Sequence, residues 1–180
     1  MRKVLTLSRS FGKFIPIGKE ILQKNGFRLI FPPEDLNLQD EKSVSDLIKR
    51  SNFVAIIAGA TKVTPMIIDA CKKLRIISKH GVGVDNIDVN YATQKNVAIT
   101  YSPNSNIESV AELTVGLILN LSRKISESCL SLKSGKWEIL LGQEILGKTM
   151  GIIGAGKIGK AVIGKLSCFS VRILVNDIIN

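Results

Sequence analysis

Short apolar runs alternate with amphipathic segments along the N-terminal part of the chain. Continuous apolar runs of about four to eight residues are typical of buried strands, whereas apolar residues that recur every three or four positions are typical of helices. On this basis, strands are predicted at residues 4–7, 27–31, 53–58, 74–78 and 97–100. Helices are predicted at residues 18–24, 40–50, 66–73 and 89–96. The alternation of strands and helices favours an open α/β fold with a parallel sheet.

The pattern changes at Ser105. Ser105 and Glu108 have the spacing of a capping box, and apolar residues then recur at helical spacing over residues 110–121, which predicts a long, well-buried helix. A second strand-helix-strand pattern follows at residues 149–153, 157–166 and 171–175. We therefore expect two domains. Residues 1–102 form a flavodoxin-like core, and residues 103–180 hold the long helix and the first βαβ unit of a Rossmann domain.

A dinucleotide-binding fingerprint lies in the second pattern, because Gly154, Gly156 and Gly159 follow a predicted strand directly and open a predicted helix. The first glycine allows the tight turn, the second lets backbone amides approach a pyrophosphate, and the third lets the helix pack closely on the strand. Asp177 follows at roughly the spacing at which a carboxylate binds the adenosine ribose. Its charge would repel a 2′-phosphate, so the motif favours NAD over NADP. The alternative is a glycine-rich turn without a ligand.

Residues 79–86 follow the fourth predicted strand at the carboxyl edge of the sheet, where open α/β sheets bind ligands. Two glycines there free backbone amides that can hold a carboxylate, and Lys79 adds positive charge. A structural turn in which Asp85 or Asn86 caps the next helix is an equally good interpretation. His80, the sole histidine, has no carboxylate partner nearby in the sequence and is more typical of a structural residue than of a proton-transfer group.

Composition excludes several other classes. The chain is 45% apolar, enough to bury a core, and no apolar run is long enough to cross a membrane. The net charge is +10, but the basic residues are scattered and aromatic residues make up only 5%, so a nucleic-acid partner is not expected. Cys71, Cys129 and Cys168 are widely spaced. We therefore expect free thiols in a cytoplasmic protein, without a metal site.

Three longer segments resemble the D-isomer-specific 2-hydroxyacid dehydrogenase family, most closely its phosphoglycerate dehydrogenase branch. Residues 74–88 are similar to the substrate loop of the family, residues 109–121 to its interdomain helix, and residues 135–159 to the stretch that leads into the nucleotide fingerprint. The resemblance implies an oxidoreductase that transfers hydride between NAD and C2 of a 2-hydroxy acid or 2-oxo acid. In this branch the reaction is the first step of serine synthesis.

The resemblance also implies roles for individual residues. Backbone groups of the substrate loop would contact the substrate carboxylate and the nicotinamide cofactor, while amides of the fingerprint would face the pyrophosphate. The residues implied in cofactor binding are Gly154, Gly156, Lys157, Ile158, Gly159, Asp177 and Val82. Those implied in substrate binding are Lys79, Val82 and Gly83.

Members of the resembled family continue beyond the second strand of the nucleotide domain, and their catalytic Arg, Glu and His lie in that continuation. No residue of this chain is therefore expected to be catalytic. We expect the N-terminal part of such an enzyme, truncated at its C-terminal side and inactive alone. The alternative is a non-catalytic NAD-binding or subunit-interaction protein, either a homodimer or paired with a full-length subunit.

Overall fold

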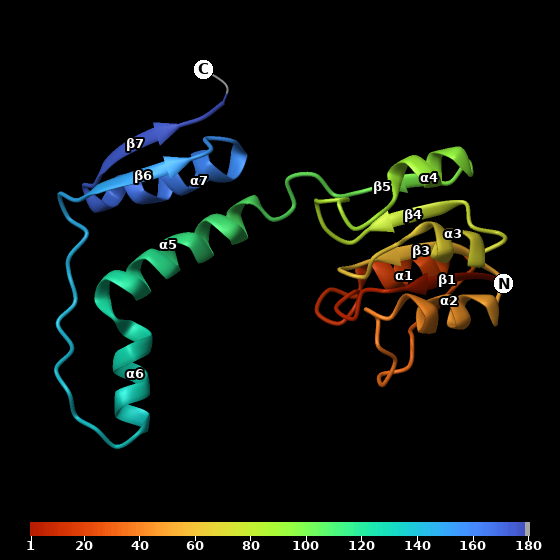
Figure 1. Ribbon diagram of the computed structural model, residues 1–180, viewed down its shortest axis with the longest axis horizontal. Coiled ribbons are helices and arrows are strands. Elements are labelled where there is room, and N and C mark those ends of the chain that lie inside the picture. The colour runs from red at the N-terminus through yellow and green to blue at the C-terminus, as the bar shows by residue number, and fades with distance from the viewer. Residues whose placement is uncertain (179–180) are drawn as a thin grey trace. The chain divides into compact units, whose positions relative to one another are not determined.

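The computed structural model describes residues 1–178 of the chain. It divides into two compact units, Met1–Pro103 and Asn104–Asn180, and each contains its own parallel sheet (Figure 1). Both units combine parallel strands with helices. The predicted α/β fold class is therefore confirmed.

The first unit is built on a five-stranded sheet of order β2-β1-β3-β4-β5, in which every neighbouring pair is parallel. This is the strand order of flavodoxin-like folds. The strands are β1 (Arg2–Thr6), β2 (Phe27–Ile30), β3 (Phe53–Ala58), β4 (Ile76–Lys79) and β5 (Ala98–Thr100). The helices are α1 (Ile17–Lys24), α2 (Glu41–Lys49), α3 (Pro65–Ala70) and α4 (Val89–Gln94).

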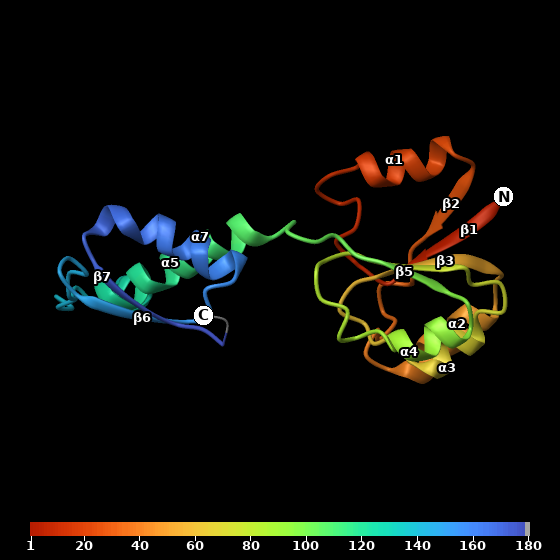
Figure 2. The same cartoon turned by 90° about the horizontal axis from the view of Figure 1, so that it is seen from above.

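The core of the first unit lies mainly on one face of this sheet. In Figure 2, α1 lies on one face, while α2, α3 and α4 lie on the other. Val44 and Ile48 of α2 are fully buried there, whereas α1 has no buried residue. Asp40 caps α2 by accepting a hydrogen bond from the Ser43 amide at 3.2 Å. A second hydrogen bond, from the Ser43 side chain, is the main reason that the pKa of Asp40 is lowered.

Two helices of the first unit, α3 and α4, end two or more residues earlier than predicted, and each has a local cause. Cys71 leaves the helical conformation at the end of α3, and its Sγ donates to the Phe53 carbonyl at 3.2 Å. Asn96, with a left-handed φ of 56°, follows the end of α4. Neither change alters the order of the elements. Both ends depend on a single residue that the apolar pattern does not distinguish.

The second unit contains the predicted βαβ pattern, in which β6 and β7 pair in parallel around a crossover helix. Its strands are β6 (Thr149–Ile153) and β7 (Arg172–Asn176). Its helices are α5 (Ile107–Arg123), α6 (Ile125–Lys133) and α7 (Lys157–Leu166), with a short 3₁₀ turn at Ser167–Phe169. β6 and α7 have the bounds predicted from the sequence. The predicted βαβ unit is therefore confirmed.

The predictions for α5 are partly wrong. The helix begins at Ile107 after an N-cap at Asn106, one residue later than predicted, and the Asn106 side chain makes no capping hydrogen bond. The helix is also not well buried. Ala111 is its one buried residue, whereas Leu117 and Leu121 are 57% and 79% exposed. Its apolar residues extend around more of its surface than α7, the helix with which it shares the small core, covers.

One side of α5 packs on α7, and polar contacts flank this packing. Ala111 forms a small core with Val162 and Leu166 of α7. Lys165 lies within 2.9 Å of the Glu108 carboxylate and 3.4 Å of the Glu112 carboxylate, and its pKa is raised mainly by the hydrogen bond with Glu108. The two helices are thus joined by apolar packing and by an exposed ion-pair cluster.

The helix α6 was not predicted. It is a short helix that contains three serines, and none of its residues is buried. Serine is a poor helix former, so the local pattern is weak. Lys124 separates α6 from α5 with a left-handed φ of 54°. Over residues 1–178, the structure has no helix with the length and hydropathy that a membrane span requires.

The three cysteines differ in their environment. Cys71 is buried and Cys129 and Cys168 are exposed. Burial raises the pKa of the Cys71 thiol to about 11, and since the thiolate is the reactive form, Cys71 is expected to be inert. In a time course with iodoacetamide at neutral pH, mass spectrometry should detect two rapidly alkylated thiols, and the third only after urea is added. Equal rates at all three positions would contradict this arrangement.

Candidate functional site

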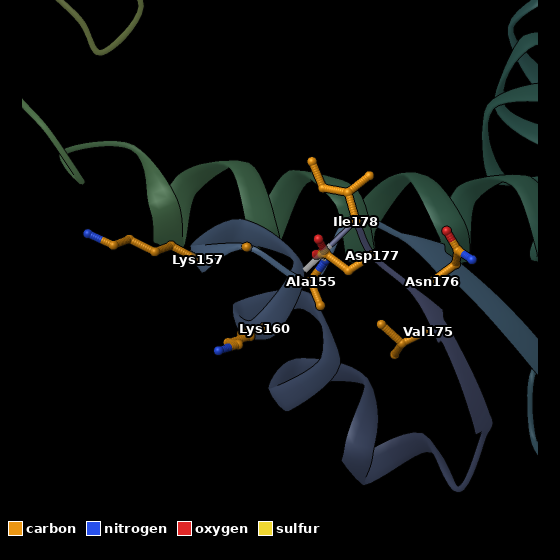
Figure 3. Close-up of a pocket in the computed structure, with 8 residues that line it drawn as sticks. Ala155, Lys157, Lys160, Val175, Asn176, Asp177 and Ile178 are labelled. Carbon is orange, nitrogen blue, oxygen red and sulfur yellow. Dashed lines mark hydrogen bonds between the residues drawn. The ribbon is translucent and has the colours of Figure 1, made fainter. Parts of the chain in front are cut away.

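The turn between β6 and α7 forms one wall of a cavity. Ile153 at the end of β6 pairs with Asn176 at the end of β7, so the loops that follow both strands lie at the same edge of the sheet. The cavity measures about 820 Å³ (Figure 3). Its lining residues are Ala155, Gly156, Lys157, Lys160, Val175, Asn176, Asp177 and Ile178. The predicted fingerprint thus borders a concave site.

Asp177 contacts the fingerprint loop directly. Its Oδ2 accepts a hydrogen bond from the Ala155 amide at 2.5 Å, and the Gly154 amide donates to the Asn176 carbonyl at 2.8 Å. The Asp177 carboxylate lies beside Ala155 in Figure 3. The predicted ribose-binding acid therefore also orders the loop that it faces.

The three fingerprint glycines meet different local conditions. Gly154 has a φ of 92°, a conformation that L side chains rarely adopt. A Cβ on Gly159 would lie 2.2 Å from the Gly154 carbonyl oxygen, closer than any side chain allows. Gly156 has an ordinary φ of −65°, and a Cβ there would meet no atom within 4 Å. The fold itself therefore requires glycine at two of the three positions, and Gly156 is the exception.

Positive charge reaches this cavity from α7. Lys157 and Lys160 both line it, and the Lys157 ammonium donates to the Asn104 side-chain oxygen at 2.8 Å. Gly156 is the N-cap of α7, and no side chain caps this N-terminus. A helix N-terminus and lysines together favour anions. Lys160 was not predicted as a site residue, although its place one turn after Lys157 puts both on the same face of the helix.

The basic residue of β7, Arg172, lies at the opposite end of the strand from Asp177. Arg172 is the first residue of this five-residue strand, and Asp177 follows its last residue, so the two Cα atoms are roughly 16 Å apart. Val175, which was also not predicted as a site residue, lies two residues before Asp177. The two-residue repeat of a strand therefore places both on the same side of the sheet.

In the first unit, the segment after β4 is tied to the segment after β3. The Lys79 ammonium donates to the Gly59 carbonyl at 2.7 Å and to the Asn86 side-chain oxygen at 2.6 Å. The predicted capping of α4 by Asp85 or Asn86 is wrong. Asp88 caps α4 instead, by accepting from the Tyr91 amide at 2.9 Å.

Val82 and Gly83 form the outer part of this loop. Val82 is half-buried and Gly83 is exposed. Within residues 1–178, neither backbone amide donates a hydrogen bond to another group of the chain. Gly81 has a φ of 142°, which favours glycine, and its carbonyl accepts from the Ser102 amide at 3.0 Å. The loop is thus anchored at Gly81, while the amides of Val82 and Gly83 donate to no group of the described residues.

His80 is held by contacts with the segment after β1. Its Nδ1 lies 2.7 Å from the Ser8 hydroxyl, and the Phe11 ring meets its ring edge to face at a centroid distance of 5.5 Å. In the described part of the chain, no carboxylate forms an ion pair with His80. Among residues 1–178, no group of three or more His, Cys, Asp or Glu side chains is arranged to hold a metal ion.

A second cavity, of about 490 Å³, lies where the segments after β1 and β3 meet. Ser8, Arg9 and Gly59 are among the residues that line it. In this strand order, β1 and β3 flank the topological switch point of the sheet, where open α/β folds bind ligands. This region was not predicted as a site, although polar residues directly follow the first predicted strand.

Known proteins are similar to this chain in both sequence and fold. Residues 10–172 match the family model described as D-isomer specific 2-hydroxyacid dehydrogenase, catalytic domain. The D-3-phosphoglycerate dehydrogenase of Sus scrofa is 39% identical over 179 residues, which are 98% of this chain and 32% of that protein. The hydroxypyruvate reductase of Thermotoga maritima is 40% identical over 161 residues, which are 87% of this chain and 53% of that protein.

A solved structure from the same group of enzymes is similar in fold to this chain. The 3-phosphoglycerate dehydrogenase of Entamoeba histolytica, crystallised with NAD⁺ bound, matches with a TM-score of 0.77 at 27% identity, over 99% of this chain and 55% of that one. The chain spans about a third of the length of the Sus scrofa enzyme. Because the family model covers most of its residues, the chain belongs to the D-isomer specific 2-hydroxyacid dehydrogenase family.

Proposed function

We propose that this chain provides the substrate loop and the adenosine half of the cofactor site of an NAD-dependent oxidoreductase that acts on the CH-OH group of a 2-hydroxy acid. The proposed substrate resembles 3-phosphoglycerate, and the proposed setting is serine biosynthesis in the cytoplasm. Residues 1–102 would form the substrate domain, and residues 103–180 would form the start of the NAD-binding domain. Bound NAD would supply hydride transfer at its nicotinamide ring.

The observation that carries the proposal is the space around Gly156. Neither its backbone conformation nor its neighbours require glycine, yet the residue lies at the uncapped N-terminus of α7 and lines the larger cavity. A pyrophosphate would need this space in order to approach the amides of Gly156, Lys157 and Ile158. Lys157 and Lys160 add the positive charge that a pyrophosphate favours. The local geometry therefore fits the anionic part of NAD.

The substrate site is proposed at the loop after β4. The unpartnered amides of Val82 and Gly83 are suited to a carboxylate, because backbone donors and a nearby cation together stabilise an anion. Lys79 supplies that cation. Val82 would also contact the cofactor, as the family resemblance implies.

Charge at Asp177 should set the choice between NAD and NADP. In Asp177→Asn, the remaining side-chain oxygen can still accept from the Ala155 amide, but the negative charge is lost. Calorimetric titration should detect tighter binding of NAD than of NADP in the unmodified chain, and a loss of about tenfold in that preference in the variant. Arg172→Gln, at the far end of β7, is the matched control and should change neither affinity. An unchanged preference in Asp177→Asn would contradict the assignment.

Gly156 and Gly159 should respond differently to substitution. Gly156→Val fills open space, so its free energy of unfolding should fall by no more than about 1 kcal/mol, while NAD affinity falls at least about tenfold. Gly159→Ala brings a Cβ against the Gly154 carbonyl and should destabilise the chain by about 1–3 kcal/mol. Urea unfolding and calorimetric titration measure the two effects. Wild-type NAD affinity in Gly156→Val would count against a pyrophosphate at this position.

The chain alone is expected to bind NAD without turning it over. The Arg, Glu and His that the family resemblance assigns to catalysis have no counterpart among these residues, so no group here is proposed to move the hydroxyl proton. Absorbance at the wavelength of NADH, with 3-phosphoglycerate and NAD present, measures turnover directly. Sustained NADH formation by the 180-residue chain would overturn this part of the proposal.

A second candidate function is a non-catalytic protein that binds NAD or pairs with another subunit. The observation that favours it is the exposed apolar surface of the second unit. Leu121, Leu130 and Trp137 are 79%, 66% and 87% exposed, and large exposed apolar patches are typical of interaction surfaces. Light scattering during the same titration separates the candidates. A stable assembly supports the subunit-pairing form of the second function, whereas a monomer contradicts that form.

A further inference from the structure

The segments that follow β3 and β4 are joined at both ends by backbone hydrogen bonds. At the strand ends, the His80 amide donates to the Ala58 carbonyl at 2.8 Å. Further along, the Val63 amide donates to the Asn86 carbonyl at 2.7 Å, and the Asp88 amide donates to the Val63 carbonyl at 3.0 Å. The loop of residues 81–84 therefore projects from a base that is fixed on both sides.

Two side chains fill the base of this loop. The Asn86 amide group donates to the Gly59 carbonyl at 3.0 Å and to the Thr61 carbonyl at 2.6 Å, while its oxygen accepts from Lys79 at 2.6 Å. Both of its N–H groups are thus used. The stem of Lys79 lies against the loop, since a Cβ on Gly81 would be 3.4 Å from the Lys79 Cε. Asn86 therefore fixes where the ammonium lies.

The positive charge of Lys79 is oriented but not neutralised. Lys79 and Asn86 are both half-buried, and the two oxygens that the ammonium contacts, on Gly59 and Asn86, belong to neutral groups. No ion pair of Lys79 occurs in the part of the chain that the structure describes. An ammonium has three donors, so one donor and the full charge are left over. A half-buried charge without a counter-ion is costly.

An aspartate at position 86 would also hold the ammonium, but it would cancel the charge. Asparagine holds it without cancelling the charge, and it has the N–H groups that the Gly59 and Thr61 carbonyls need. The fold alone does not explain why Lys79 should be aimed and left charged. An anion that binds beside Gly81 would explain both features.

We propose that Asn86 is a positioning residue, which aims the Lys79 ammonium and preserves its charge for the carboxylate of a bound 2-hydroxy acid at the amides of Val82 and Gly83. This inference rests on the function proposed for the loop. It differs from the assignment of Lys79 alone, because it makes the binding of the carboxylate depend on a neutral residue that does not touch it.

The test uses the full 180-residue chain and nuclear magnetic resonance. D-glycerate is the carboxylate probe and inorganic phosphate is the second probe. The shifts of the Val82 and Gly83 amides report binding, and the Lys79 side-chain nitrogen signal reports whether the ammonium is held. The variants are Lys79→Met, Asn86→Asp and Asn86→Ala, and Asn90→Ala in α4 is the matched control.

The unmodified chain and Asn90→Ala should show a saturable shift with D-glycerate. Lys79→Met and Asn86→Asp should each weaken D-glycerate binding by about tenfold or more. Asn86→Asp should keep the Lys79 nitrogen signal, because the carboxylate still holds the ammonium, whereas Asn86→Ala should lose both the signal and the affinity. If Asn86 were only structural, Asn86→Asp would not keep the Lys79 nitrogen signal while losing affinity for D-glycerate.

Four results would overturn the inference. They are wild-type affinity in Lys79→Met, wild-type affinity in a folded Asn86→Asp, an unchanged Lys79 signal in Asn86→Ala, and amide shifts with phosphate but not with D-glycerate. If Asn86→Asp fails to fold, Lys79→Met and Asn86→Ala still decide the question. Absence of any D-glycerate shift would overturn the carboxylate site, and it would leave NAD binding by the second unit unaffected, so the two proposals can fail separately.

Discussion

The close approach of α7 to the end of β6 is the constraint on which the second unit depends. The contact occurs at Gly159, where the nearest backbone atom leaves no room for a Cβ. The same helix, α7, carries Val162 and Leu166, which pack on Ala111 of α5 to form the small core of the unit. The contact at Gly159 also fixes the N-terminus of α7 at the carboxyl edge of the sheet, beside Asp177. The packing that stabilises the unit is therefore the packing that creates its cavity.

The first unit places its candidate site by a related principle. Parallel strands end at a common edge, and the segments after β3 and β4 meet there, but no glycine contact between helix and strand holds them. Lys79 and Asn86 do this through hydrogen bonds to main-chain carbonyls. Polar side chains must then satisfy the backbone of two loops at once. This requirement explains why hydrogen-bonding side chains lie half-buried at the base of the loop, but it does not explain why one of them, Lys79, carries a charge.

The sequence predicted best those features that neighbouring residues determine. β3, β6 and α7 have the predicted bounds because each is a continuous apolar or amphipathic run between clear breaks. Predictions from the sequence failed for features that depend on contacts between residues far apart in the chain. The burial of α5 depends on how much of its surface α7 covers, and α6 is a short, serine-containing helix that the sequence does not separate from the end of α5. The contacts of Lys79 and Asn86 with the Gly59 carbonyl were missed because they form only when β3 and β4 are brought side by side. Asp177 was predicted, but its contact with the Ala155 amide was not.

Residues that the fold does not require are the best guide to what the chain binds. The conformation of Gly154 and the crowding at Gly159 account fully for glycine at those positions, so neither argues for a ligand. Gly156 has open space, and the Lys79 ammonium forms no ion pair with a carboxylate of the described residues. In a chain that bound no ligand, neither residue would be expected to stabilise the fold through these features. Both lie at the carboxyl edges of parallel strands, and both features suit an anion. The two units therefore carry separate arguments for anionic ligands, and either argument stands without the other.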